Sequence, residues 1–558
     1  MRNILKKTGC SFSRVLTCLL ATTMGAASFG SVSGCSSAKP QPPATLQHVS
    51  VHDPSMIRAG DTYYLLGSHA ASAKSKDLIK WTQLSRDYEK PDDEPFFGKL
   101  AETLKESFRW AGYHDGDAAS YAVWAPDIIY DGAYRWQDGS KGAYLLYYCT
   151  SSTWRRSCIG YLASKTIDGK YQYVDTVVYS GFTKTGDPDG NSSRNTKWDN
   201  DYLNLKRLIA KTSKNGGIDS IEDDQCFKAD GSWNNLYAPN AIDPTVFFDA
   251  SGKRMYMVYG SWSGGLFVLG MDPSTGEPQY PGVDSKDPVS GNFTDRYFGT
   301  HIAGGNHESG EGPFIQYDDE TGYYYLYESY GGLNATGGYN MRLFRSKKVL
   351  GPYLDAAGRN SANSGSDNAS YGIKLIGNYK FANQTGKRSA GGNSALIDQD
   401  GARYLIYHQR FDFKPVDEFH EVRVHQQFLS SEGWPVTAVY EYRGEKISNY
   451  GEDDVTGTYE FINHGTEAKS GDMLKTEHVV LNKGGTVTGD ETGAWTKADS
   501  KKGYDYITLQ LGKTIYHGVF FQQYDEQNKP QKKMTFTAIG NDNTSVWGSK
   551  TGGTPDSK

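Results

Sequence analysis

The chain has 558 residues, which allows two or more domains or one large repeat architecture. Its net charge is −6 and its Lys and Arg are scattered, so the composition argues against a nucleic-acid-binding protein. Aromatic residues make up 13% of the chain, which contains 40 Tyr and 64 Gly. This profile is typical of many short strands joined by Gly-rich turns, and it also suits sugar binding.

Residues 1–35 have the pattern of an export signal. "MRNILKK" is basic, "VLTCLLATTMGAASFG" is apolar, and "SVSGC" ends at Cys35 in a motif that resembles a bacterial lipobox. We therefore predict an exported protein whose lipidated Cys35 is its only membrane contact at the bacterial cell surface, followed by a polar linker over residues 36–46. The alternative is an ordinary cleaved signal in which Cys35 has no role. No later apolar run is long enough to span a bilayer.

Five segments between residues 47 and 445 repeat one plan: a short apolar strand, a polar turn and a Tyr-rich strand. Such units of three or four antiparallel strands predict an all-β fold, a five-bladed β-propeller over residues 47–445. The five segments are "HDPSMIRAGDTYYLLGS", "APDIIYDGAYRW…GAYLLYYCTSS", "IDPTVFFDASGKRMYMVYGS", "EGPFIQYDDETGYYYLYES" and "GNSALIDQDGARYLIYHQR".

The first strands of all propeller blades begin at the same end of the axis, so residues at those starts converge. A single acid at a strand start is most often structural, because Asp favours turns. Its recurrence predicts a cluster of carboxylates, which glycoside hydrolysis needs. The residues at the five starts are Asp53, Asp127, Asp243, Glu311 and the Asn393–Ser394 pair.

Residues 452–558 again show short alternating strands and predict a separate small β-barrel or sandwich, which packs against the propeller or holds polymer. Polar stretches from about 86 to 118 and about 180 to 236 are read as insertions that decorate one face. Cys149 and Cys158 flank a short segment, and either a bridge or two free thiols is compatible with it. The odd Cys226 leaves at least one thiol unpaired.

Seven motifs occur in an order that resembles glycoside hydrolase family 43, most closely its endo-1,5-α-L-arabinanases with a C-terminal β-domain. The resemblance covers nearly the whole chain after the signal. It implies a five-bladed propeller that hydrolyses α-1,5-L-arabinofuranosidic bonds of arabinan with inversion of configuration. The motifs are "VHDPSM", "WAPDI", "NAIDPTVFFD", "YGSWSGG", "EGPFI", "YLIYHQR" and "VRVHQQFLSSEGWPV".

The resemblance assigns roles to three acids. Asp53 in "HDP" matches the general base, Glu311 in "EGP" the general acid, and Asp243 in "NAIDP" the carboxylate that tunes the pKa of the acid. The stretch "ESGEGP" leaves Glu308 as a second candidate acid. Asp127 follows its proline, and alternation along a strand turns it to the other face, so we expect a structural role.

The resemblance also implies a metal and a set of substrate contacts. His408 in "YHQR" matches a histidine that holds calcium in the central channel, although a lone strand histidine is more often part of the core. Trp124, Trp154 and Trp262 are either stacking platforms for sugar rings or structural, and His52 either binds a hydroxyl group or fixes the strand start. The remaining expected substrate contacts are Asn240, Ala241, Ile242, Gly260, Ser261 and His307.

Alternative functions remain open at this point. An exo-acting α-L-arabinofuranosidase or β-xylosidase on the same fold would follow if the insertions close one end of the groove. A non-catalytic surface glycan-binding lipoprotein would have lost part of the acid set, and a structural adhesin would need none of it. We expect a monomer that acts on a polysaccharide.

Overall fold

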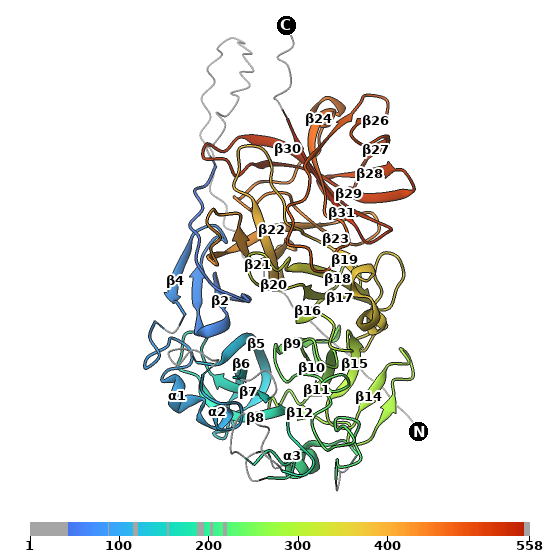
Figure 1. The fold of residues 1–558 in the computed structure, drawn as a ribbon. Helices are drawn as coiled ribbons and strands as arrows, with labels where there is room; N and C mark the ends of the chain where they lie inside the picture. Colours follow the sequence, from blue (N-terminus) through green and yellow to red (C-terminus); the bar gives the residue numbers. More distant parts are fainter. Residues whose placement is uncertain are drawn as a thin grey trace, which may run out of the picture. The chain divides into compact units, whose positions relative to one another are not determined.

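Short antiparallel strands make up most of the regular structure of the chain (Figure 1). The computed structural model describes residues 43–551, except 88, 115–120, 153–155, 187–194, 201, 202, 204 and 216–219. Cys35 and the predicted export signal therefore lie outside the described residues. Within the described part, no helix combines the length and the apolar composition needed to cross a bilayer.

Five sheets follow one another along the first part of the chain, and four of them have four strands in sequential order. The first two of these are β1 (Ser55–Ala59), β2 (Thr62–Leu66), β3 (Ser72–Ser75) and β4 (Trp81–Ser85), then β5 (Val123–Arg135), β6 (Lys141–Ser151), β7 (Ser157–Ser164) and β8 (Gln172–Ser180). The last two are β16 (Glu311–Asp318), β17 (Tyr323–Tyr330), β18 (Asn340–Ser346) and β19 (Ile373–Lys374), then β20 (Lys387–Ile397), β21 (Arg403–Phe411), β22 (His420–Leu429) and β23 (Pro435–Thr437).

The middle sheet has seven strands and departs from the predicted unit of three or four. The segment after β11 turns back and pairs with it through β15, so extra strands extend the sheet outward. Four regular four-stranded blades are thus present where five were predicted. The strands of the middle sheet are β9 (Thr245–Phe248), β10 (Met255–Tyr259), β11 (Leu266–Met271), β12 (Pro278–Gln279), β13 (Ser285–Lys286), β14 (Phe293–Asp295) and β15 (Gly299–Ala303).

The first strands of the five sheets pack around one axis. β1 contacts β5, β5 contacts β9, β9 contacts β16, β16 contacts β20, and β20 returns to β1. Apolar clusters fill the spaces between neighbouring sheets, as between Leu66 and Ile128 or between Met56 and Ile406. The described fold is therefore an all-β propeller with its core between the blades.

The C-terminal strands form a closed barrel, which decides between the predicted barrel and sandwich. Trp547 and Phe521 of the barrel share an apolar cluster with Tyr407 and Val436 of the propeller, so the two parts are packed together. The barrel strands are β24 (Gly457–Asn463), β25 (Glu477–Leu481), β26 (Thr486–Gly489), β27 (Gly493–Asp499), β28 (Asp505–Leu511), β29 (Thr514–Tyr524), β30 (Lys532–Gly540) and β31 (Ser545–Lys550).

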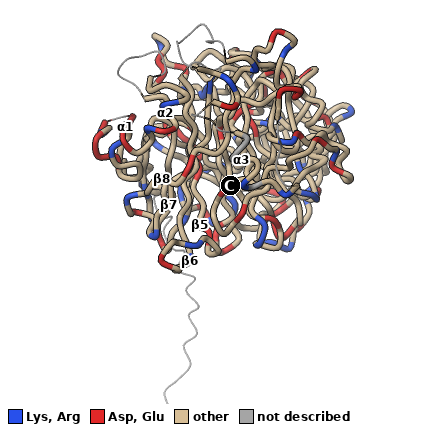
Figure 2. The backbone as a smooth tube through the Cα atoms, turned by 90° about the horizontal axis from the view of Figure 1, so that it is seen from below, with Lys and Arg blue, Asp and Glu red and all other residues tan. Residues whose placement is uncertain are grey.

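Helices are few and short among the described residues. α1 (Leu100–Thr103), α2 (Lys105–Ala111) and α3 (Leu205–Thr212) lie in the predicted insertions, and α4 (Glu452–Val455) precedes the barrel. Single 3-10 turns occur at η1 (Ser68–Ala70), η2 (Ser361–Ser366) and η3 (Asn368–Ser370). In the view of Figure 2, acidic and basic segments are interspersed, in keeping with the scattered charges of the sequence.

Candidate active site

Each of the five first strands has a residue with left-handed backbone close to it, shortly before β1 and β9 and within β5, β16 and β20. The angle φ is 51° at Asp53, 30° at Ala125, 54° at Asp243, 57° at Gly312 and 57° at Gly392. This conformation is costly for residues other than glycine, and it persists where the surrounding structure enforces it, often at functional sites. These five residues and their followers surround a cavity of about 30 Å³. The predicted convergence is therefore confirmed for Asp53, Asp243 and the Asn393–Ser394 pair, whereas Gly312 takes the position that was predicted for Glu311.

The alignment of the second sheet needs a correction, because Ala125 and not Asp127 holds the strand-start position. Asp127 is buried in β5, where its Oδ1 accepts a hydrogen bond from the Ser55 hydroxyl at 2.5 Å. Its Oδ2 accepts the backbone N–H of Val246 at 2.7 Å. Asp127 thus connects three neighbouring sheets, as the alternation along its strand predicts.

The three predicted catalytic acids, Asp53, Asp243 and Glu311, line a single cleft of about 700 Å³. Trp154 lies outside the described residues, and Ala241 and Gly260 are not among those that line the cleft. The predicted substrate-binding residues that do line it are His52, Trp124, Asn240, Ile242, Ser261, Trp262 and His307.

Ala241 and Gly260 each have a structural role beside the cleft, and their substrate contacts stay predictions. Ala241 is fully buried, and its backbone N–H donates to the Ser180 hydroxyl at 2.9 Å. Gly260 has φ of 122°, and a Cβ added there would lie 2.3 Å from the carbonyl oxygen of Gly265. Only glycine fits this close approach of two backbones.

Asp53 is surrounded by hydrogen-bonding groups. Its Oδ2 lies 2.9 Å from Nδ1 of His52 and accepts the Ser68 hydroxyl at 2.6 Å. Burial alone raises the pKa of Asp53, but the attraction of His52 and the hydrogen bonds from His52 and Ser68 outweigh it, so the pKa lies below its usual value. Asp53 is therefore ionised at neutral pH and can accept a proton.

Glu311 begins β16 beside the tryptophan of the predicted "GSW" contact. Its Oε2 accepts the indole N–H of Trp262 at 2.8 Å and the Ser261 hydroxyl at 3.3 Å. Burial raises the pKa of Glu311 above its usual value, and the charge of Asp53 adds to this, although hydrogen bonds from Tyr339 and Trp262 oppose it. A raised pKa lets this carboxyl keep a proton for donation.

Asp243 has fewer partners than Asp53. Its Oδ2 accepts the backbone N–H of Gly312 at 3.2 Å, and its own N–H donates to Sγ of Cys149 at 3.4 Å. Burial, followed by the charges of Glu311 and Asp53, raises the pKa of Asp243 well above its usual value. Because two neighbouring, half-buried carboxyls resist double ionisation, Asp243 and Glu311 together retain a proton while Asp53 is charged.

Of the two glutamates in "ESGEGP", the geometry favours Glu311 as the acid. Glu308 is partly exposed and forms an ion pair with Lys469 at 3.0 Å. Glu311 lines the cleft and Glu308 does not belong to its lining.

Aromatic rings form part of the cleft walls. The indole N–H of Trp124 donates to the carbonyl of Ser151 at 3.0 Å, and its ring lies 4.6 Å from that of His69. The rings of Trp262 and His307 lie 6.0 Å apart. Each tryptophan has its polar atom bonded and lies in the cleft wall, as a stacking platform for a sugar requires.

His408 lies next to the acids, with its ring stacked on that of His52 at a centroid distance of 3.9 Å. Burial lowers the pKa of His408 well below its usual value, so the imidazole is neutral, which is the form that binds metals. Its Nε2 is buried with no hydrogen-bond partner among the described residues, and its Nδ1 accepts the backbone N–H of Asp53 at 3.3 Å and lies 3.7 Å from Oδ1 of the same residue. His52, Asp53 and His408 each offer one possible ligand atom, and these atoms lie within 4.8 Å of one another, so the three residues fit a metal ion.

The open question about the cysteines is answered by the register of β6 and β7. Cys149 pairs with Ile159 and Cys158 pairs with Thr150, so the two side chains point to opposite faces of the sheet. Cys149, Cys158 and Cys226 are free and buried. The thiol of Cys149 supports the site instead, between Asp243 and the carbonyl of Trp124.

Sequence reasoning missed several residues of the cleft lining, among them Tyr339, Arg410 and His420. Arg410 follows His408 by two positions on β21, so alternation places both on one face and was a usable signal. Tyr339 stands in a Gly-rich turn before β18, where no sequence pattern indicates that it bonds to Glu311.

One cleft with aromatic walls thus contains an ionised carboxylate, Asp53, and a pair of carboxyls, Asp243 and Glu311, that retains a proton. These groups provide the base and the acid that glycoside hydrolysis requires. Fold and cleft together therefore define a propeller-fold glycoside hydrolase.

Comparison with known proteins agrees with the class of propeller-fold glycoside hydrolases and indicates the family within it. Residues 209–435 match glycosyl hydrolases family 43, and residues 439–548 match a C-terminal lipocalin-like domain. The extracellular endo-alpha-(1->5)-L-arabinanase 2 of Bacillus subtilis (strain 168) is 38% identical over 520 residues, which cover 90% of this chain and 93% of the relative. The extracellular endo-alpha-(1->5)-L-arabinanase of Thermotoga petrophila is 36% identical over 521 residues, or 90% of this chain and 94% of the relative.

A crystal structure of endo-1,5-alpha-L-arabinanase from Thermotoga petrophila RKU-1 is similar with a TM-score of 0.72 and 34% identity, covering 91% of this chain and 100% of that chain. The chain belongs to glycoside hydrolase family 43, and it is a glycoside hydrolase.

Proposed function

We propose that the protein is an endo-acting hydrolase of α-1,5-linked L-arabinan that inverts the configuration at the anomeric carbon. The observation that carries the proposal is the gathering of Asp53, Asp243 and Glu311 in one cleft. It is supported by two relatives, similar over 90% of the chain, that are endo-arabinanases. Inversion follows from membership of the family.

Asp53 acts as the general base. Its pKa is held below the usual value, so at neutral pH it accepts a proton from the water that attacks the anomeric carbon. His52 and Ser68, both bonded to Oδ2, hold the carboxylate in place while the proton moves.

Glu311 acts as the general acid and gives its proton to the departing glycosidic oxygen. Trp262 and Ser261 bond to Oε2 of Glu311 and fix the orientation of the carboxyl. Asp243, half-buried beside Glu311, keeps a proton within the pair, since ionising both carboxyls next to the charged Asp53 is unfavourable.

We further propose that the seven-stranded sheet serves as a fifth blade. Its first strand, β9, takes its place in the ring between β5 and β16, and Asp243 at its start has the same left-handed backbone as the other four starts. The additional strands β12 to β15 then decorate the blade without changing the position of its first strand.

For the metal, we propose a calcium ion held by His408 and water. When bound, such an ion would supply positive charge that favours the ionised form of Asp53. The test is calcium removal with a chelator and re-addition, with activity and the melting temperature Tm as readouts. The proposal predicts that both fall and recover in wild type, and that neither responds in His408→Ala.

For localisation, we propose export and a lipid anchor at Cys35, in line with relatives that are extracellular. The test is metabolic labelling with a radioactive fatty acid. Label on wild type that disappears in Cys35→Ser would support the anchor, and equal label on both would contradict it. Gel filtration of the purified protein tests the proposed monomer.

The activity itself is tested by the products from debranched linear arabinan. We expect oligosaccharides of mixed length from wild type and from Glu308→Ala, and no products from Glu311→Ala. Arabinose as the sole product would instead indicate exo action with a closed groove. Untouched arabinan would contradict the substrate assignment and favour the glycan-binding alternative.

A further inference from the structure

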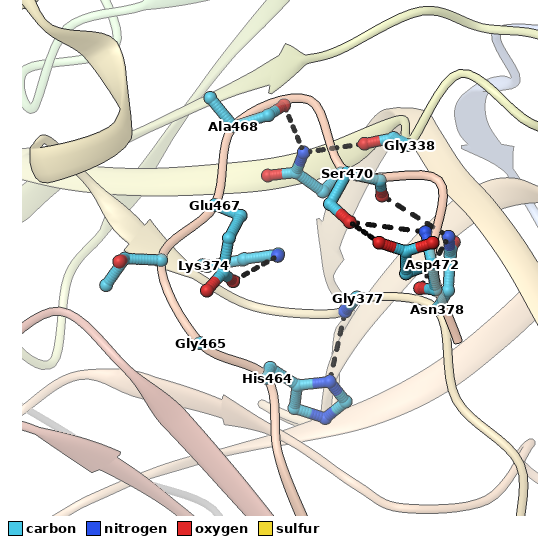
Figure 3. Close-up of polar contacts among 12 residues, drawn as sticks. Gly338, Lys374, Gly377, Asn378, His464, Gly465, Glu467, Ala468, Ser470 and Asp472 are labelled. Carbon is cyan, nitrogen blue, oxygen red and sulfur yellow. Dashed lines mark hydrogen bonds and ion pairs between the residues drawn. The ribbon is translucent and has the colours of Figure 1, made fainter. Parts of the chain in front are cut away.

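The loop between β24 and β25 leaves the barrel and lies against the propeller (Figure 3). We name residues 464–474 of it the bridging loop. Nδ1 of His464 accepts the backbone N–H of Gly377 at 3.0 Å, and the carbonyl of Ala468 accepts the side-chain amide of Asn340 at 3.0 Å. The bridging loop is thus bonded to the propeller before residue 469.

The bridging loop is equally fixed after residue 469. The guanidinium of Arg388 donates to the carbonyl of Gly471 at 2.6 Å. A Cβ added to Gly338 would lie 2.4 Å from the carbonyl oxygen of Ser470, and one added to Gly471 would lie 2.1 Å from that of Thr336. Glycine on each side permits this backbone-to-backbone packing, so the loop has little freedom to shift.

Lys469 stands between these two anchored stretches and points at the rim of the cleft. Its Nζ lies 3.0 Å from Oε2 of Glu308 and 5.7 Å from the ring centroid of Trp262. The indole of Trp262 in turn donates to Oε2 of Glu311 at 2.8 Å. One ammonium group of the barrel is therefore separated from the acid of the cleft by a single indole ring.

We propose that Lys469 is a positioning residue that the C-terminal barrel supplies to the active site. It fixes the Trp262 ring, and with it the hydrogen bond to Glu311, and it holds Glu308 at the same rim. Through Lys469, the C-terminal barrel thus takes part in positioning the active site. The proposal rests on the proposed function of Glu311 and Trp262. Lys469 touches neither the substrate nor the reacting atoms, so its effect passes through the indole.

The size of the effect follows from the exposure of the groups. The side chains of Lys469 and Glu308 are 50% and 41% exposed, so their attraction is screened by water. The contact of this exposed ammonium group with the half-buried Trp262 ring is also modest. Removing both contacts is expected to lower kcat/KM about three- to tenfold.

The test compares Lys469→Met with wild type on debranched linear arabinan. Lys475→Met is the matched control, because Lys475 is an exposed barrel lysine with its own ion pair to Glu477 at 3.1 Å. We expect Lys469→Met to lower kcat/KM with Tm unchanged, Lys469→Arg to restore it, and Lys475→Met to match wild type. Wild-type kcat/KM in Lys469→Met would overturn the proposal, whereas an inactive wild type would instead contradict the proposed substrate.

A double-mutant cycle with Trp262→Phe tests the route of the effect. If Lys469 acts through the indole, its removal has little further effect once the indole N–H is gone. An undiminished loss in the Trp262→Phe background would overturn the proposal. A crystal structure of Lys469→Met gives a readout independent of substrate: a displaced Trp262 ring is expected, and a ring unchanged in position and order would contradict it.

Discussion

Asp53 and Asp243 start the first strands of two sheets with nearly the same backbone and with opposite electrostatic surroundings. Both precede a proline, and φ is 51° at one and 54° at the other. Both side chains point into the same cleft. The repeat thus places two identical carboxyl groups at equivalent positions around the axis.

The neighbours of the two carboxyls decide their protonation. Asp53 receives hydrogen bonds at Oδ2 from Ser68 and contacts His52, and its pKa falls. Asp243 lies half-buried beside Glu311 with one backbone donor, and its pKa rises. The comparison teaches that fold symmetry provides the position of an acid, while residues outside the repeated motif determine whether it works as a base or keeps a proton.

The largest expected effect comes from removing the proton donor. Glu311→Gln keeps the shape of the side chain but cannot protonate the leaving oxygen, so kcat on linear arabinan should fall by about 10²- to 10⁴-fold. Glu308→Gln is the control and should keep kcat within about threefold of wild type, because its exposed ion pair is a weak contact. Equal losses in both variants would contradict the assignment of the acid.

A smaller effect is expected when Asp53 loses one donor. Ser68→Ala removes a hydrogen bond that favours the ionised carboxylate, so the pKa of Asp53 rises and the acidic limb of the kcat/KM profile moves to higher pH. The sign follows because the base works only when ionised. The alkaline limb, which reflects the proton of Glu311, should stay in place. A profile with an unmoved acidic limb would show that Ser68 does not tune Asp53.

Asp127 should affect stability and leave the chemistry intact. Asp127→Asn can no longer accept both the Ser55 hydroxyl and the Val246 N–H, which leaves a buried donor unpaired. We expect the free energy of unfolding to fall by about 1–3 kcal/mol with kcat within about twofold of wild type. Denaturant unfolding and arabinan hydrolysis of the same sample measure both. A large loss of kcat would place Asp127 in the reaction.

The smallest expected effect concerns the thiols. Because Cys149 and Cys158 face opposite sides of the sheet, a reducing agent should leave Tm unchanged. A lower Tm after reduction would show a disulfide that the strand register forbids.

Much of this site follows from sequence, since Asp-Pro recurrence and strand alternation place Asp53 and Asp243 on the axis and turn Asp127 away. What sequence cannot provide is contact between distant segments. Ser68, which follows β2, meets Asp53, which precedes β1, and Tyr339 reaches Glu311 from the turn before β18. The seven-stranded sheet forms because β15 pairs back onto β11. Asp127 was misplaced at a strand start because the second unit reads "APD" where the first and third read "DP", and the backbone angles give that position to Ala125.

The central claim is that Asp53 and Asp243, which have nearly the same backbone conformation at the start of two strands, have opposite protonation states. This claim is tested most directly by comparing Asp53→Asn with Asp243→Asn at neutral pH. Asparagine resembles a protonated aspartic acid, so it should replace Asp243 with less harm than Asp53. We predict that kcat on an arabino-oligosaccharide falls by about 10³-fold or more in Asp53→Asn and by about ten- to a hundredfold in Asp243→Asn. A larger loss in Asp243→Asn than in Asp53→Asn would contradict the account.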